Sequence, residues 1–420
     1  MNGPSRPAPC EVKAPGLRVA IYHDLPSGGA KRALYAQLAG LRARGHEIHA
    51  FVPTTADESF LPTLDVVSAI TPWPRPMPPE RDALLAGRGV LTGLRRWASF
   101  FRTLQASERA LARQISDGGF DVVFVQPSQF TQAPLLLRGL TIPSLYYCQE
   151  ALRAAHEPRV TTPGMRVLIR ETLGRLDHST VRRATAVAVN SVYSADVIRR
   201  VYGRVADVIP LGVDAEHFRP LPVTRDRSVL SVGALHPLKG HDTVIDAVAR
   251  IPAASRPIVR IVGDRSRAGE ADRLLRRAAE AGVTIDLRLR VDEQELVRLY
   301  NGAGVVVLTP HGEPFGLAAL EAMACATPVI AVDEGGLRET VGRVDAGFLE
   351  PREPQRIAAR ILHLLDDAAV TAALGHRARQ HVLSHWGWAQ AIDALEARLV
   401  QLSATGGRGP SRPGNRAGSS

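Results

Sequence analysis

Apolar residues follow two alternating patterns along this chain. Short runs rich in valine, isoleucine, leucine and tyrosine have the continuity of buried parallel strands, and the stretches between them carry apolar residues at helical spacing. In the first half, the opening run is followed by a predicted helix from about Ala30 to Arg44. The strands predicted in this half are Val19–Tyr22, Glu47–Val52, Asp65–Val67, Asp121–Val125, Ser144–Tyr147, Ala186–Val189 and Val205–Pro210. This order predicts a doubly wound α/β domain.

A second series of the same kind follows residue 209. Its predicted strands are Arg227–Gly233, Ile258–Val262, Val283–Leu287, Val305–Leu308 and Val329–Val332. Because 420 residues are too many for a single domain with one ordinary hydrophobic core, we expect two Rossmann-like domains with a cleft between them, at residues 17–208 and 209–385. A final helix is expected at residues 386–403. Residues 1–16 and 404–420, which are rich in proline and other residues that build no core, are expected to be a disordered leader and tail.

Composition narrows the class of protein. The chain is 45% hydrophobic and 22% charged, and it has no apolar run of about 20 residues, so we expect a soluble protein without a membrane span. No secretory signal is visible, and the three cysteines, Cys10, Cys148 and Cys325, are widely spaced, which favours a cytoplasmic location. The net charge of +10 favours an anionic partner. Nucleic acid is disfavoured because no recognisable nucleic-acid-binding module with basic residues among aromatic ones appears, and aromatic residues make up only 5% of the chain.

The most informative segment runs from His311 to Glu321. It combines a strand end, a tight turn, the start of a helix predicted at Leu317–Ala326, and two carboxylates. Pro314 holds the preceding residue out of helical geometry, and Gly316 leaves no side chain between the backbone and a ligand, so the amides of residues 315–317 can face a phosphate. Carboxylates beside an anion site would repel a phosphate directly, so we expect both to accept hydrogen bonds from hydroxyl groups of the same ligand. The alternative is an ordinary turn with a solvated Glu321 and a Glu313 that responds to the helix dipole.

Two glycine-bearing segments carry further candidate chemistry. In Gly233–Gly240, Lys239 is predicted to open a helix and to place its ammonium group beside a diphosphate; the alternative is a surface lysine. Gly28 and Gly29 lie in a loop after the first strand, where doubly wound folds bind ligands; the alternative is an ordinary turn. This loop lacks the three-glycine spacing of nicotinamide dehydrogenases, which disfavours that class.

The run EPFGLAALEAMACATPVIAVDEGGLRETV resembles the donor-site segment of the retaining GT-B glycosyltransferases of family 4, and the similarity extends from Arg18 to about Leu402. The resemblance implies that Glu321 accepts hydrogen bonds from ribose and that Glu313 accepts them from the donor sugar. It also implies that the amides of Phe315, Gly316 and Leu317 hold the diphosphate together with Lys239, and that Gly28 and Gly29 approach from across the cleft. It further implies a crossover at Gly212–Asp214 and a final helix that returns to the first domain.

The chain departs from this family at three positions. Ala234 stands where an arginine usually accompanies the lysine, Gln149 stands near a usual histidine, and Ala326 replaces a common glycine. The candidates to replace the missing arginine charge are Arg265, Arg267 and His236. Gln149 can still donate and accept hydrogen bonds, although it cannot titrate.

From these residues and this resemblance we expect a retaining transferase that moves a hexosyl unit from a nucleotide-diphosphate sugar to a glycan or a lipid-linked hydroxyl, in the synthesis of cell-envelope polysaccharide. Two alternatives stay open: a catalytically silent partner subunit that binds nucleotide sugar or glycan, and a nucleotide-sugar epimerase. No motif fixes the sugar, the base or the acceptor.

No cofactor or metal ion is expected. His376, His381 and His385 lie near one another in the sequence, but no carboxylate completes a ligand set and no Asp-x-Asp pair is present. The basic, aromatic segment Leu94–Arg102 suggests peripheral contact with an anionic membrane at its inner face; the alternative is helix packing against the sheet.

Overall fold

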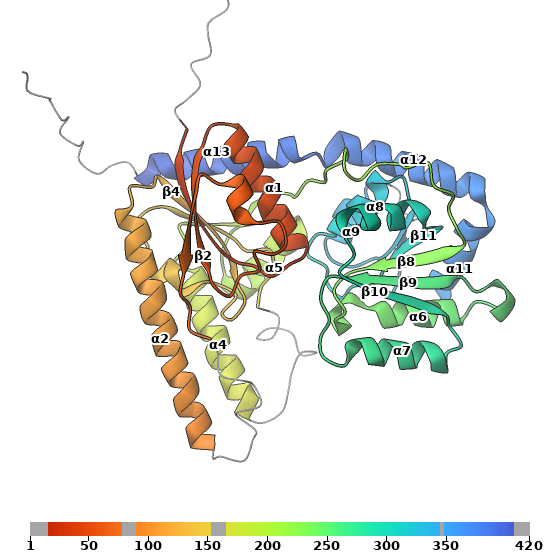
Figure 1. Cartoon of the computed structure of the whole chain (residues 1–420), viewed down its shortest axis with the longest axis horizontal. Helices are drawn as coiled ribbons and strands as arrows, with labels where there is room; N and C mark the ends of the chain where they lie inside the picture. The colour runs from red at the N-terminus through yellow and green to blue at the C-terminus, as the bar shows by residue number, and fades with distance from the viewer. Residues whose placement is uncertain (1–15, 78–89, 153–164, 345–347, 407–420) are drawn as a thin grey trace, which may run out of the picture.

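The computed structural model describes residues 16–77, 90–152, 165–344 and 348–406, which form two lobes side by side (Figure 1). The first lobe, called here the first domain, holds a parallel seven-stranded sheet of order β3-β2-β1-β4-β5-β6-β7. Its strands are β1 Arg18–Asp24, β2 Glu47–Pro53, β3 Ala69–Trp73, β4 Val122–Ser128, β5 Ser144–Tyr147, β6 Ala186–Val189 and β7 Asp207–Val208. Its main helices are α1 Gly29–Ala43, α2 Val90–Asp117, α4 Met165–Val181 and α5 Val192–Tyr202.

The second lobe, called the second domain, holds a parallel six-stranded sheet of order β10-β9-β8-β11-β12-β13. Its strands are β8 Ser228–Val232, β9 Ile258–Gly263, β10 Ile285–Leu289, β11 Val305–Leu308, β12 Val329–Val332 and β13 Leu349–Glu350. Its helices are α6 His241–Ala249, α7 Glu270–Glu280, α8 Glu293–Gly302, α9 Leu317–Ala324, α10 Leu337–Thr340, α11 Pro354–Asp366 and α12 Ala368–His385. The last helix of the chain is α13, Trp388–Gly406.

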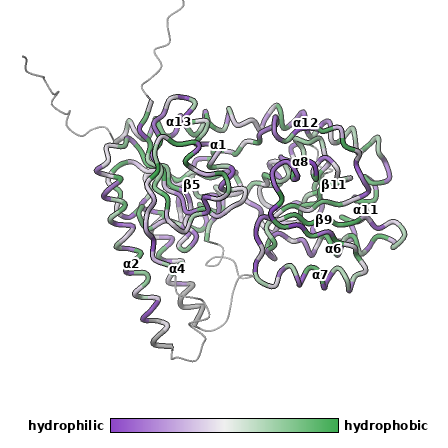
Figure 2. Tube along the Cα trace, in the orientation of Figure 1, coloured by the Kyte–Doolittle hydropathy of each residue, from purple (hydrophilic) through white to green (hydrophobic). Residues whose placement is uncertain are grey.

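Continuous apolar runs form the centre of both sheets. Every residue of β4 and of β11 is buried, because helices cover both faces of a parallel sheet and leave no face for alternating polar residues. Hydrophobic residues accordingly follow the strands inside each lobe, and hydrophilic residues mark the outer helices (Figure 2). The predicted fold class, two Rossmann-like doubly wound domains, is confirmed.

The chain crosses between the domains twice at one place. The Val213 amide donates to the Trp386 carbonyl over 2.8 Å, and Val213 also bridges with Gly387. Beyond this crossing, α13 lies against α1, β4 and β5 of the first domain. Glu396 of α13 pairs there with Arg44 and with His46, which holds the helix in place.

Several predicted elements differ in the structure: β7 is shorter than the predicted Val205–Pro210, and β10 begins at Ile285 and not at Val283. The strand predicted at Asp65–Val67 is wrong: Thr63–Val66 is a 3-10 turn, and the edge strand follows at Ala69–Trp73. Pro62 precedes this turn, and the side chains of Val66 and Val67 are buried in the core without belonging to a strand. Helix α9 ends at Ala324 and not at Ala326, and α13 continues to Gly406, so residues 404–406 are helical and not part of a tail. The other predicted leader and tail residues, 1–15 and 407–420, lie outside the described residues.

The aromatic residues of Leu94–Arg102 face the protein interior. Phe100 is 5% exposed and packs with Trp97, Phe101 and Leu104 against Leu135 of the first domain. This is the arrangement expected from helix packing against the domain. Among the helices of the described residues, none combines the length and the apolarity needed to cross a bilayer.

Ala326 adopts a left-handed conformation with φ 56°, at the position after the helix end where glycine is preferred. We therefore expect Ala326→Gly to stabilise the protein by about 1 kcal/mol, since an alanine Cβ is strained in this region. The measurement is the thermal midpoint of unfolding. As a control, Ala359→Gly on the exposed face of α11 should destabilise by about 1 kcal/mol. A lower midpoint for Ala326→Gly would contradict the strain argument.

Candidate functional site

The turn between β11 and α9 is held by direct packing of backbone on backbone. A Cβ atom at Gly335 would lie 2.4 Å from the Glu313 carbonyl oxygen, and one at Gly336 would lie 2.2 Å from the Pro314 oxygen. The Gly336 amide also donates to the Glu313 carbonyl over 2.8 Å. Gly316 has φ 104°, which a residue with a side chain rarely adopts, and it caps α9. The first amides of α9 therefore lie at a turn whose path is fixed by glycine.

A second segment, Pro237–Gly240, packs on the same turn. The His311 amide donates to the Leu238 carbonyl over 2.8 Å, and the Thr309 hydroxyl donates to the Gly240 carbonyl over 2.6 Å. Lys239 ends a 3-10 turn two residues before α6, so the prediction that it opens a helix is wrong. Gly240 follows it in the left-handed region with φ 69°, which separates the 3-10 turn from α6.

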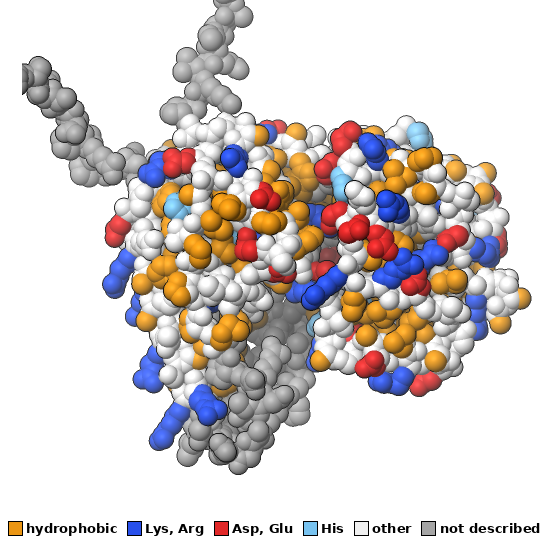
Figure 3. Space-filling view, viewed as in Figure 1, with side chains coloured by type: hydrophobic (Ala, Val, Ile, Leu, Met, Phe, Trp, Pro, Cys, Tyr) orange, Lys and Arg blue, Asp and Glu red, His pale blue; other side chains and the backbone are white. Residues whose placement is uncertain are grey.

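Glu313 and Lys239 form an ion pair. The Lys239 ammonium donates to Glu313 Oε2 over 2.7 Å, and the two side chains are 35% and 18% exposed respectively. The structure thus brings together the two residues predicted to carry the chemistry, although they are 74 residues apart in the chain. Both side chains retain contact with solvent. Acidic and basic side chains gather at the junction of the two lobes (Figure 3).

Glu321 lies at the other side of the turn and is only 5% exposed. Tyr300 Oη donates to its Oε2 over 2.8 Å, and Arg32 Nη1 donates to its Oε1 over 2.7 Å. Arg32 also donates through Nη2 to Glu293 over 2.6 Å. The alternative of a solvated Glu321 is wrong, because burial among these partners replaces water.

The predicted glycine loop of the first domain lies against the second domain. Gly28 has φ 126°, and a Cβ there would lie 2.7 Å from Asp264 Oδ2. A Cβ at Gly29 would lie 3.4 Å from Leu317 Cδ1. Phe315 is 3% exposed, and its ring packs edge-on against that of Trp386 with 5.4 Å between the ring centroids. Its side chain therefore belongs to the core, and its backbone forms part of the turn.

The candidates for the missing charges have other contacts. His236 Nδ1 accepts from the Leu238 amide over 3.1 Å and so caps its own turn. The Arg265 carbonyl accepts from the Leu235 amide over 2.7 Å, which places the backbone of Arg265 beside the residue that follows Ala234. Its guanidinium lies 3.5 Å from Asp264 and is half exposed. Gln149 donates to Gln126 Oε1 over 3.2 Å in the first domain.

Four contributing residues were missed by sequence reasoning. Arg32 and Tyr300 donate to Glu321, and Glu293 accepts from Arg32. Arg352 donates to the carbonyls of Thr309 and Pro310 while pairing with Glu334. Arg32 stands three residues after the glycine pair, which was the available signal. The others lie on elements distant in sequence and gave none.

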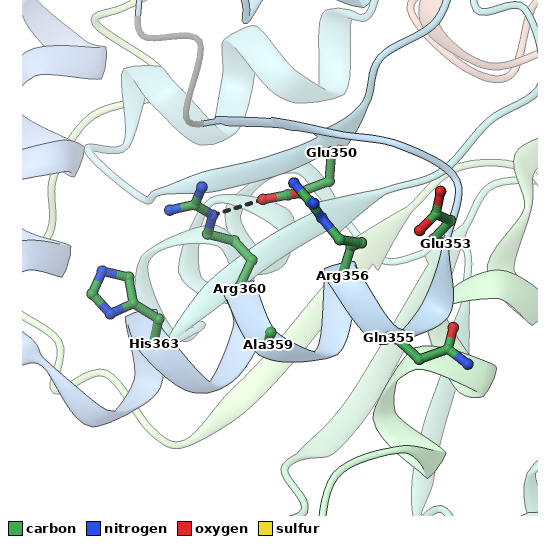
Figure 4. A pocket seen from close by; sticks show the side chains of 7 residues that line it. All are labelled: Glu350, Glu353, Gln355, Arg356, Ala359, Arg360 and His363. Atoms are coloured by element: carbon green, nitrogen blue, oxygen red, sulfur yellow. Dashed lines mark hydrogen bonds and ion pairs between the residues drawn. The ribbon is translucent and has the colours of Figure 1, made fainter.

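A separate shallow pocket lies on α11 (Figure 4). Its arginines, Arg356 and Arg360, already pair with the buried Glu350, and none of its lining residues belongs to the turn or to the segments around it. We assign it no role. Among the described residues, no three or more His, Cys, Asp or Glu side chains gather as metal ligands, and His381 and His385 stack on each other at 4.4 Å. That no ion is required stays a prediction.

Comparison with known families identifies the family of the chain. Residues 27–217 match the model described as Glycosyltransferase Family 4, and residues 213–381 match Glycosyl transferases group 1. The chain belongs to glycosyltransferase family 4. The second match contains the turn, Lys239 and both glutamates, and the first contains the glycine loop.

Curated relatives of this family carry a more specific name. The chain is 35% identical over 257 residues to D-inositol 3-phosphate glycosyltransferase 1 of Catenulispora acidiphila, which covers 56% of this chain and 61% of that protein. It is 35% identical over 285 residues to D-inositol 3-phosphate glycosyltransferase of Geodermatophilus obscurus, which covers 63% and 60%. The chain therefore spans about three fifths of the length of the curated relatives it matches.

Solved structures show the same GT-B fold over nearly the whole chain. Sucrose-phosphate synthase from Thermosynechococcus elongatus has a TM-score of 0.70 at 22% identity, covering 93% of this chain and all of that one. Anabaena Alr3699/HepE in complex with UDP-glucose has a TM-score of 0.71 at 20% identity, covering 92% and 100%. At these identities the likeness establishes the fold.

Buried His241 directly follows the Pro237–Gly240 segment, and it makes the folding stability depend on pH in a predictable direction. Its ring bonds with the Ser231 hydroxyl over 2.9 Å and with the Gly233 carbonyl over 3.2 Å. Burial lowers its pKa from 6.5 to about 4, so the unfolded chain binds more protons between these values and folding stability falls as the pH drops through that window. At pH 5 this loss amounts to about 2 kcal/mol.

We therefore expect the thermal midpoint of the wild type to fall more, between pH 7 and pH 5, than that of His241→Gln. The comparison with the variant is needed because burial raises the pKa of Asp177 to about 6, which gives the opposite slope. Equal falls in the two proteins would contradict a titrating His241.

Proposed function

We propose that the chain is a retaining glycosyltransferase that transfers a hexosyl unit from a nucleotide-diphosphate sugar to a glycan or lipid-linked hydroxyl. One observation carries the proposal: the Glu313–Lys239 ion pair lies on one side of a glycine-fixed turn and the buried Glu321 lies on the other. The turn offers amides for phosphate, and the flanking carboxylates offer acceptors for hydroxyl groups.

In this proposal the donor lies along the turn of the second domain. Glu321 accepts hydrogen bonds from ribose, and the amides of residues 315–317 hold the diphosphate together with Lys239. The lysine counters the negative charge that develops on the leaving phosphate as the glycosidic bond breaks. Glu313 accepts from hydroxyls of the donor sugar. No side chain is assigned as a nucleophile; the leaving phosphate oxygen takes the proton of the acceptor hydroxyl.

The acceptor enters from the first domain. Relatives named for D-inositol 3-phosphate and neighbours solved with UDP-glucose support a nucleotide-sugar donor and a hydroxyl acceptor. For a lipid-linked acceptor, the exposed arginines of α2, which include Arg95, Arg96 and Arg102, supply charge for contact with an anionic membrane surface. The proposed place of reaction is the cytoplasm or the inner face of that membrane.

The first test uses Glu313→Ala and Lys239→Ala. Each variant should lower the rate of sugar transfer by about 100-fold, because each removes one electrostatic partner of the reacting ligand. Arg277→Ala on α7 is the matched control, since it removes an ion pair with Asp246 on an outer helix. Wild-type rates in both site variants would overturn the assignment.

The second test asks which ligand binds. UDP-, GDP- and ADP-sugars are screened by thermal shift, and one of them should raise the midpoint selectively, by an amount that grows with ligand concentration. The nucleotide sugar that binds is then incubated with the protein, with and without acceptors. Binding without turnover would identify a silent partner subunit, and conversion of the sugar without acceptor would identify an epimerase; both results would contradict transfer.

A further inference from the structure

Arg32 of α1 reaches from the first domain to two carboxylates of the second. Its Nη1 donates to Glu321 on α9 over 2.7 Å, and its Nη2 donates to Glu293 at the start of α8 over 2.6 Å. The guanidinium also lies over the ring of Phe218, 5.4 Å from its centroid. The side chain is 21% exposed, so it is held within the junction of the domains and does not extend freely into solvent.

The bonds to Glu321 define which acceptor positions remain. A carboxylate has about four lone-pair positions. Arg32 takes one on Oε1 and Tyr300 takes one on Oε2, so each oxygen keeps one further position. Because the two donors come from opposite domains, they fix the rotation of the carboxylate only when the domains are in contact.

Other contacts hold the domains together beside the same turn. The Ser191 hydroxyl donates to the Pro314 carbonyl over 2.6 Å. Glu339 of α10 accepts from the amides of Val192 and Tyr193, at the start of α5, over 2.9 and 2.7 Å. The turn and Glu321 are therefore both bonded to first-domain residues in one arrangement of the domains.

We propose that Arg32 is a positioning residue of the donor site, which orients the Glu321 carboxylate so that its two remaining acceptor positions receive the ribose hydroxyls. This inference rests on the proposed function, in which Glu321 binds ribose. Residues of both domains then contribute to the nucleotide site, because an arginine of the first domain affects how tightly a carboxylate of the second domain binds ribose.

The test is a double-mutant cycle measured by calorimetry with UDP, GDP and ADP as probes. Arg32→Ala should weaken binding of the preferred nucleotide by about tenfold, the scale of one lost charge-assisted hydrogen bond. In a Glu321→Gln background the same change should alter the dissociation constant less than about twofold, because residues that act through one another are not additive. Arg32→Lys should recover part of the affinity, since a lysine keeps the charge but loses the planar fork.

The 2′,3′-dideoxy form of the preferred nucleotide separates positioning from a general structural role. The wild type should bind the dideoxy form more weakly than the ribose form, and Arg32→Ala should lose most of that preference. Arg44→Ala is the matched control, since Arg44 caps α1 and pairs with Asp393 and Glu396 away from the turn. This control should keep the preference.

The outcomes distinguish two failures. Unchanged or tighter nucleotide binding by Arg32→Ala, with Glu321→Gln weakened, would overturn the role of Arg32 alone. Unaltered binding by Glu321→Gln, or no binding of any of the three nucleotides by the wild type, would overturn the proposed donor site and this inference with it.

Discussion

The candidate site depends on backbone packing that only glycine permits. Gly335 and Gly336 lie directly against the backbone of residues 313 and 314, and Gly240 lies against Thr309 with no room for a Cβ atom. These contacts fix the turn before any side chain is considered. The carboxylates before and within α9 then project from a rigid base, and rigid support is what a binding site needs to hold its groups in a productive geometry.

The charges of the site are arranged in complementary pairs. Glu321 is buried, and a buried carboxylate without a cation or hydrogen-bond donors would be strongly destabilising. Arg32 and Tyr300 meet that need, and Lys239 meets it for Glu313. Glu321 is thus both a residue proposed to bind the ligand and a residue with a partner in the first domain, which links binding to the relation between the domains.

Sequence reasoning succeeded where the signal was local. Buried apolar runs such as Val305–Leu308 and Ala186–Val189 predicted the strands, and the resemblance in the segment after β11 predicted the family. It failed for Asp65–Val67, where a proline-started turn buried the apolar pair without a strand. The bond between Arg32 and Glu321 was beyond prediction, because it joins residues 289 positions apart and depends on how two folded bodies meet.

The paired crossing at Val213 and Trp386 limits how the two lobes can move. Both covalent connections pass through one hydrogen-bonded point, so the lobes can swing about a pivot but cannot slide apart independently. Phe315 packs on Trp386, which places the turn beside that pivot. In a rotation about this pivot, the displacement of an atom grows with its distance from the pivot. The turn would therefore move little, while parts of the lobes further away would move more.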